Sequence, residues 1–182
     1  MNRTTLTAVA AAVAMAFAAA AVARSMTKTE YQSSKQTIES EYKSAVSSCE
    51  ALKDNAKDIC VAEAKGKQKV ALAELSAAYK PGAKAHYHVR MAQAEADYSV
   101  AREKCDDQAG NAKDVCVKEA KAARVGAEAD AEAQKKTWSA KHEAADDKRE
   151  AGYAVAKEKC AALEGSAKDG CMNDAKARHG KS

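Results

Sequence analysis

Three pairs of cysteines with the same internal spacing restrict the folds open to this chain more than any other feature. Ten residues separate the two cysteines of each pair, a tyrosine stands seven residues before the first, and Ala-Lys follows four residues after the second. The three copies align without gaps and begin at Tyr42, Tyr98 and Tyr153, so they are 56 and 55 residues apart. A detailed pattern that recurs at a fixed period indicates a repeat architecture.

The middle of each cysteine pair is typical of a turn between two helices. Glycine in a left-handed conformation commonly closes a helix, and Asn or Ser commonly caps the next one. Gly110-Asn111 and Gly165-Ser166 combine these types at the centre of the second and third pairs, and Asp54-Asn55 takes the same place in the first. An acidic residue three positions after the predicted cap suits the positive end of the helix dipole. Each repeat is therefore predicted to form an antiparallel helical hairpin.

The hairpin also predicts how the six cysteines pair. In one unbroken helix, cysteines 11 residues apart would lie about 16 Å apart, whereas a disulfide needs Cα atoms within about 7 Å. In a hairpin the two cysteines lie opposite each other. Six cysteines allow about 15 pairings, and the repeat favours Cys49–Cys60, Cys105–Cys116 and Cys160–Cys171. Each bond should contribute about 3 kcal/mol on the chain-entropy model.

The N-terminus has the three parts of a secretory signal: a basic start, an apolar centre and a small-x-small site. Arg3 precedes an uncharged stretch, and Ala21-Val22-Ala23 ends it directly before Arg24. We expect cleavage between Ala23 and Arg24. The alternative is a retained anchor, but alanine is weakly apolar and a membrane span needs about 20 predominantly apolar residues. Export would place the cysteines where disulfides persist, with no membrane insertion after cleavage.

The composition after residue 23 excludes an ordinary α/β or β-sandwich core. That part of the chain holds only two Ile, four Leu and nine Val, while the whole chain has 46 Ala. Half of it consists of Ala, Glu, Lys, Arg and Leu, which is typical of long helices or coiled coils. The sequence therefore predicts an all-α fold, an elongated up-and-down array or bundle of disulfide-stapled helical hairpins.

Breaker residues divide this array into repeats. Pro81-Gly82 cannot continue a helix. Residues 137–139 follow the second cysteine of their repeat at the same distance, so we predict a second break there; one continuous helix is the alternative. The predicted organisation is a signal peptide at 1–23 and hairpin repeats at 24–80, 81–137 and 138–182, the last with a short second helix. The predicted helices are 27–53, 56–79, 83–109, 112–136, 139–164 and 167–177.

No motif for catalysis is present. The chain lacks a Gly-rich phosphate loop, G-x-S-x-G and H-E-x-x-H, and without C-x-x-C the cysteines do not favour thiol exchange. We expect no enzyme activity and no cofactor. Weak metal candidates are His86 and His142, at corresponding repeat positions, and Asp146, one turn after His142. Solvent-exposed histidines are the favoured interpretation, so no metal is predicted.

The charge balance argues against nucleic acid as a partner. Lys and Arg total 30 against 26 Asp and Glu, a net charge of only +4, whereas a nucleic-acid surface needs a basic patch. Faces dominated by alanine also suit lipid binding poorly, because amphipathic membrane helices need large apolar residues. Contacts with proteins remain as the expected mode of action. The sequence indicates neither the partner nor the oligomeric state.

Four stretches of the mature chain resemble Ala/Lys/Glu-rich exported repeat proteins of Gram-negative bacteria, sometimes labelled TolA-like or cell-envelope proteins. These stretches are 55–67, 94–107, 110–122 and 171–182. The resemblance implies a periplasmic or envelope protein and carries no site residues with it. We expect a non-catalytic protein with a structural, stress-related or chaperone-like role among periplasmic or envelope proteins. The alternative is a periplasmic metal- or small-ligand-binding protein.

Overall fold

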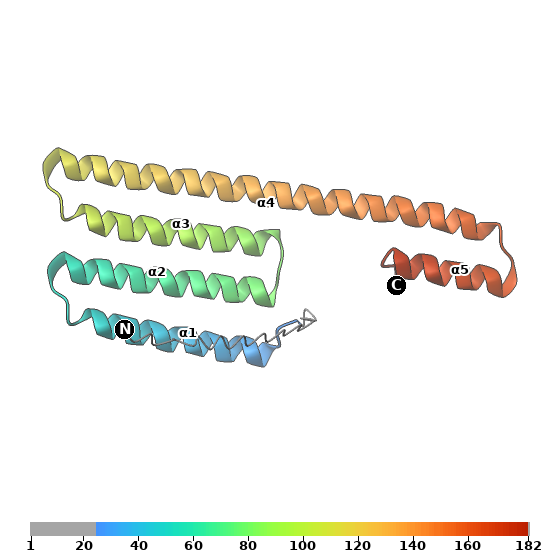
Figure 1. Cartoon of the computed structure of the whole chain (residues 1–182), viewed down its shortest axis with the longest axis horizontal. Coiled ribbons are helices and arrows are strands. Elements are labelled where there is room, and N and C mark those ends of the chain that lie inside the picture. Colours follow the sequence, from blue (N-terminus) through green and yellow to red (C-terminus); the bar gives the residue numbers. More distant parts are fainter. Residues whose placement is uncertain (1–24, 182) are drawn as a thin grey trace, which may run out of the picture.

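The computed structural model describes residues 25–181, and this part of the chain consists of five helices without a strand (Figure 1). The helices are α1 (Lys28–Cys49), α2 (Asp54–Tyr79), α3 (Ala83–Cys105), α4 (Gly110–Ala161) and α5 (Gly165–Arg178). The predicted all-α fold is confirmed. The predicted signal peptide and its cleavage site at Ala23-Arg24 lie outside the described residues.

The helices form an open array and not a closed bundle. α1, α2, α3 and the first half of α4 lie side by side in one layer, and successive helices run antiparallel (Figure 1). Between residues 25 and 181, each helix contacts only the helices directly before and after it in the chain. α4 runs on beyond the end of α3, and α5 folds back against its second half (Figure 1).

Two of the predicted helix boundaries are confirmed. Thr27 forms a capping box at the start of α1: its Oγ1 accepts from the Glu30 backbone N–H at 3.2 Å, and the Glu30 side chain accepts from the Thr27 N–H at 2.7 Å. This arrangement satisfies two N–H groups that a helix N-terminus otherwise leaves free. α2 ends at Tyr79 and α3 begins at Ala83, so Pro81-Gly82 separates them as predicted.

The turns inside the hairpins use left-handed residues, but the predicted caps are wrong. Asp54, Gly110 and Gly165 have φ angles of 52°, 57° and 55°, and the second helix of each hairpin begins at this residue. The residues that precede these helices make no side-chain capping hydrogen bond. Asn55 instead donates to the Glu103 carbonyl at 2.8 Å and to Asp107 Oδ1 at 2.7 Å. Its amide ties α2 to the end of α3, because the neighbouring hairpin supplies acceptors within reach.

The predicted break at residues 137–139 is wrong, and the alternative of one continuous helix is correct. α4 covers 52 residues, and Thr137 Oγ1 donates to the Ala133 carbonyl at 3.0 Å within it. Thr, Trp and Ser keep their backbone N–H groups and can continue a helix, unlike the Pro-Gly pair at the corresponding positions of the first repeat. The boundary predicted between the second and third repeats therefore lies inside α4, and the third hairpin projects from the array (Figure 1).

Small residues form the core. Among the described residues no polar or charged side chain is buried, and the buried set is Cys49, Ala64, Leu75, Ala77, Ala92, Ala94, Ala96, Cys105, Ala131, Cys160 and Ala175. Small side chains let helix backbones approach closely, most tightly between α2 and α3. A Cβ added at Gly66 would lie 2.9 Å from the Ala96 Cβ. Packing between such small side chains buries little apolar area per residue, so the disulfides are important for the stability of the fold.

Candidate functional site

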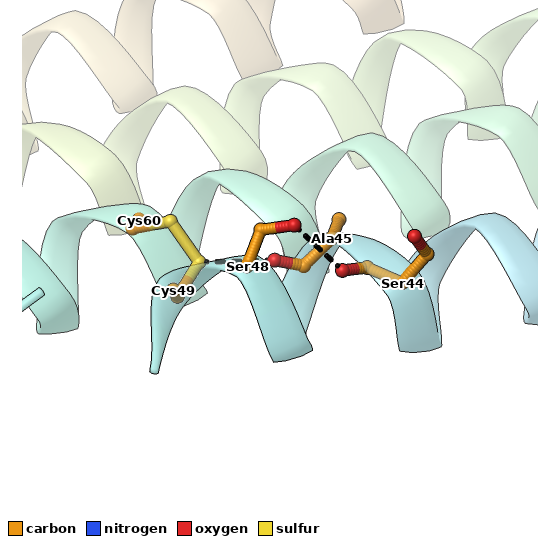
Figure 2. Close-up of a disulfide and its surroundings, with 5 residues drawn as sticks. All are labelled: Ser44, Ala45, Ser48, Cys49 and Cys60. Carbon is orange, nitrogen blue, oxygen red and sulfur yellow. Dashed lines mark hydrogen bonds between the residues drawn. A yellow bond between two sulfur atoms is a disulfide. The ribbon is translucent and has the colours of Figure 1, made fainter. Parts of the chain in front are cut away.

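Each hairpin is closed by one disulfide near its turn, in the predicted pairing. The Cα atoms are 5.7, 5.7 and 5.6 Å apart in Cys49–Cys60, Cys105–Cys116 and Cys160–Cys171. The first cysteine of each pair is completely buried. Figure 2 shows Cys49 with its Sγ 3.2 Å from the Ala45 carbonyl oxygen. Residues 25–181 contain no free cysteine, so the sulfurs act there as staples and not as thiol nucleophiles.

The two candidate histidines lie around the same tryptophan. His86 is exposed near the start of α3 and lines a shallow groove together with Trp138 of α4. The ring of His142 stacks on Trp138, with 3.5 Å between ring centroids and 29° between ring planes. The sequence pointed to the histidines but missed Trp138 as their common neighbour. The i, i+4 spacing of Trp138 and His142 was the available signal, once the helix is known to continue there.

The third metal candidate has a different partner. Asp146 is exposed and forms an ion pair with Arg149, three residues further along α4. Over residues 25–181, no group of three or more His, Cys, Asp or Glu side chains lies together as a metal site would require. The structure thus places His86 and Trp138 along one groove and stacks His142 on Trp138, but does not assemble the histidines with Asp146 into a ligand set.

A groove of about 660 Å³ runs along the α2–α3 contact. Its lining is small and apolar in the middle and charged at the rims, where Glu63 and Lys104 face each other at 3.9 Å. No histidine, cysteine, serine or tyrosine contributes to this lining. The described lining of the groove therefore contains no hydroxyl, thiol or imidazole group, and its ion pair joins the two helices.

A second cross-helix ion pair lies on the other side of this contact. Lys69 of α2 bonds to Glu95 of α3. The pKa of Glu95 is lowered chiefly by this hydrogen bond, and further by the positive charges of Lys69 and Arg124. Both partners are about half exposed, so the pair contributes modestly to stability, at most about 1 kcal/mol. It sets the register of α2 against α3.

Cations lie over two tyrosines of α3. The Arg124 guanidinium lies 5.3 Å from the Tyr98 ring centroid and the Lys135 Nζ lies 4.7 Å from that of Tyr87. Arg124 also bonds to Glu128 at 2.6 Å, which raises the pKa of the guanidinium. These tyrosines are half-buried, and cation–π contacts link them across the α3–α4 contact. The repeat pattern singles out Tyr98 but gives no sign of its cation.

The second half of α4 is the most open part of the described chain. Every residue from 136 to 151 is exposed, because α5 is too short to reach this stretch (Figure 1). Large apolar side chains elsewhere are also exposed, at Leu52, Val115, Val125, Val155 and Leu163. No helix among residues 25–181 is both long and apolar enough to span a membrane. The surface of this part of the chain thus consists of extended helix faces that carry both positive and negative side chains.

The comparisons with known proteins found no match. No family model matches the chain, and no curated protein or solved structure matches it. The class that the fold itself defines is an open, all-α array of disulfide-closed hairpins.

Proposed function

We propose that this chain is an exported, non-catalytic repeat protein of the periplasm or cell envelope that acts by contacts with other proteins. The observation that carries the proposal is the combination of an open one-layer helix array with a disulfide in every hairpin. Disulfides form and persist in oxidising compartments such as the periplasm, which supports export. Stacked helical repeats present extended surfaces to partner proteins, which supports a role in contact.

The character of the surface supports a structural or chaperone-like role. Exposed valines and leucines are scattered among lysines and carboxylates along the helix faces. Such a surface can contact unfolded segments through isolated apolar side chains while it stays well hydrated. Stapled hairpins would keep these faces in place under conditions that unfold other envelope proteins.

The test is a pair of measurements on the chain expressed in full in a Gram-negative host. The protein recovered from the periplasmic fraction should begin at Arg24 and carry three intact disulfides by mass spectrometry under non-reducing conditions. The purified protein should suppress aggregation of a thermally unfolded client in proportion to its concentration. The matched control is the same protein after reduction and alkylation. Retention in the cytoplasm would contradict export, and equal suppression by the reduced chain would contradict a role for the folded array.

One observation favours a second candidate, a small-ligand-binding protein. His86 and Trp138 line the groove between α3 and α4, His142 stacks on Trp138, and a stacked indole–imidazole pair offers a flat aromatic surface. Titration with divalent metals and with planar aromatic compounds, followed through Trp138 fluorescence, tests this candidate. The matched control is His142→Ala, which removes the stacked ring. A saturable change lost in this variant would support the candidate.

A further inference from the structure

One helix face of the array has no partner among the described residues. The outer face of α4, defined here as the side of its first half turned away from α3, carries a shallow groove lined by Asn111, Asp114, Val115, Lys118, Glu119 and Ala122. Val115 is 46% exposed there. Within residues 25–181, α4 contacts only α3 and α5, and α5 lies against its second half (Figure 1). When the second repeat is aligned with the first, this face of α4 corresponds to the face of α2 that packs against α3.

The α2–α3 contact shows how such a face is covered. The Asn55 amide donates to the Glu103 carbonyl at 2.8 Å, and Lys104 lies 3.9 Å from Glu63. At the centre of the contact, Gly66 faces Ala96.

The repeat reproduces these residues on both sides of the contact, whereas the Lys69–Glu95 ion pair becomes Val125 and Glu150. On the outer face of α4, the counterparts of Asn55, Glu63 and Gly66 are Asn111, Glu119 and Ala122. In the second half of α4, the counterparts of Ala96, Glu103 and Lys104 are Ala151, Glu158 and Lys159. Five of the six residue types are identical, and all six counterparts are exposed. Both halves of a helix–helix contact are thus present on one chain.

These two halves cannot meet within one chain as it is folded. Glu119 and Lys159 belong to the same continuous helix, α4. Forty residues at about 1.5 Å of rise each separate them by about 60 Å along the helix axis. The side chains that complete the contact must therefore come from another molecule.

We propose that the outer face of α4 binds a second copy of this chain, through antiparallel pairing of the two α4 helices. In this pairing Ala122 of one copy faces Ala151 of the other, and Glu119 meets Lys159 of the second copy. The same two contacts form at the other end, with the two-fold axis at residues 136 and 137. A closed, self-complementary interface of this kind is the commonest form of homodimer. Each array then gains the second half of α4 and α5 from its partner.

The side chains at the other interface positions are compatible in size. Ala92 and Val70 face each other across α2 and α3 by the same register, and their counterparts are Asp147 and Gly126. A longer side chain on one helix thus meets glycine on the other. Ala122 carries a Cβ where Gly66 has none, and at Gly66 that Cβ would come within 2.9 Å of its neighbour. The α4–α4 spacing is therefore wider than the α2–α3 spacing, and the dimer is reversible.

The continuity of α4 explains why the partner is a second copy. Thr137 and Trp138 occupy the positions of Pro81 and Gly82, and without a break the third hairpin cannot fold back onto its own chain. When the segment that could act as a hinge stays straight, two copies can exchange the same element and so form a dimer. Here the hinge is Thr137-Trp138 and the exchanged element is the third hairpin. The double variant T137P/W138G restores the break, so its third hairpin should cover the outer face of α4 in the same molecule. This inference goes beyond the proposed function, because it holds whether or not the protein is exported or binds clients.

The experiment is sedimentation equilibrium of the mature, oxidised chain from about 1 to 300 µM, a range that spans micromolar dissociation constants. The expected result is a concentration-dependent approach to twice the monomer mass. Glu119→Lys and Lys159→Glu should each raise the dimer dissociation constant about tenfold, and the double reversal should restore it to within about threefold. Glu63→Lys is the matched control, because this charge lies in the α2–α3 contact and should leave the dissociation constant unchanged.

The T137P/W138G variant supplies an independent arm, with helicity by circular dichroism as the check that it folds. It should remain monomeric at every concentration. A wild-type chain that stays monomeric throughout would overturn the proposal. A dimer that ignores both charge reversals would also overturn it, as would a folded T137P/W138G variant that still dimerises. Each of these results would overturn the dimer but would leave export and client binding unaffected, so the two proposals can be distinguished.

Discussion

The close approach of α2 and α3 makes a sharp prediction about Gly66. Replacing glycine by alanine inside a helix normally stabilises a protein by about 1 kcal/mol, because alanine loses less conformational freedom on folding. At Gly66 the new Cβ would lie 2.9 Å from the Ala96 Cβ and 3.5 Å from its Cα. Carbon atoms at rest lie about 3.5–4.0 Å apart. The helices must therefore separate, which costs about 1–3 kcal/mol, and Gly66→Ala should leave stability unchanged or lower it by up to about 2 kcal/mol.

Two other helical glycines supply the matched controls. In a single copy of the chain, an added Cβ at Gly126 or Gly170 meets no described atom within 4 Å, so at concentrations where the chain is monomeric alanine at either position should gain the full 1 kcal/mol or so. The assay is thermal unfolding by circular dichroism with the disulfides intact. For a chain of this size, 1 kcal/mol corresponds to about 2–4 °C in Tm. Gly66→Ala should thus melt several degrees below Gly126→Ala.

A double variant tests the cause. In an Ala96→Gly background the facing Cβ is absent, and Gly66→Ala should recover the stabilisation of about 1 kcal/mol seen at the open glycines. If Gly66→Ala in the otherwise unchanged chain raises Tm as much as Gly126→Ala does, the close α2–α3 contact is refuted.

Three further predictions follow from the turns, the charges and the staples. Asp54→Gly should stabilise the chain by about 0.5–1 kcal/mol and Gly110→Ala should destabilise it by a similar amount, because both positions are left-handed; equal and opposite shifts in Tm would check this. The lowered pKa of Glu95 means that its contribution is complete above the ordinary carboxyl range and is lost as pH falls through the folded value. Glu95→Gln should therefore lower Tm near neutral pH, by at most about 1 kcal/mol in stability, and the gap should close as the pH falls below the ordinary carboxyl range, whereas a gap that stays constant with pH would contradict the ion pair. Replacing Cys105–Cys116 by serines should lower the helicity and Tm of the whole array, whereas replacing Cys160–Cys171 should melt mainly α5, which among the described helices contacts only α4. Each bond contributes about 3 kcal/mol on the chain-entropy model, and equal losses of helicity by circular dichroism would refute the difference.

Features that depend on neighbours in the chain could be predicted from the sequence. The cysteine pairing follows from a spacing that only a hairpin can close, and the Thr27–Glu30 box and the Pro81-Gly82 break each involve a few adjacent residues. The left-handed residues of the turns belong to the same group. Local geometry alone decides these features, because their energies arise within one or two helical turns.

The candidate site could be predicted only in part. The disulfides were accessible from spacing, and the histidines from their matching repeat positions. Their common contact with Trp138 was not, because it depends on α4 continuing through residues 137–139. Polar residues at that point allow either a helix or a turn, and the balance is too small for sequence pattern to decide.

The tertiary structure alone decided how the hairpins are arranged. Alanine side chains are short and nearly alike, so alanine-rich helix faces do not specify which neighbour they pack against. The sequence pattern is therefore equally compatible with a closed bundle and with an open layer. Among the described residues only successive helices touch, which makes the layer, and close packing at Gly66 and Ala96 with the cross-helix bonds of Asn55 and Lys69 holds α2 against α3. These contacts join residues far apart in sequence, and their geometry exists only once the helices are packed. The sequence by itself therefore determined which hairpins form, and packing between small residues determined where each hairpin lies.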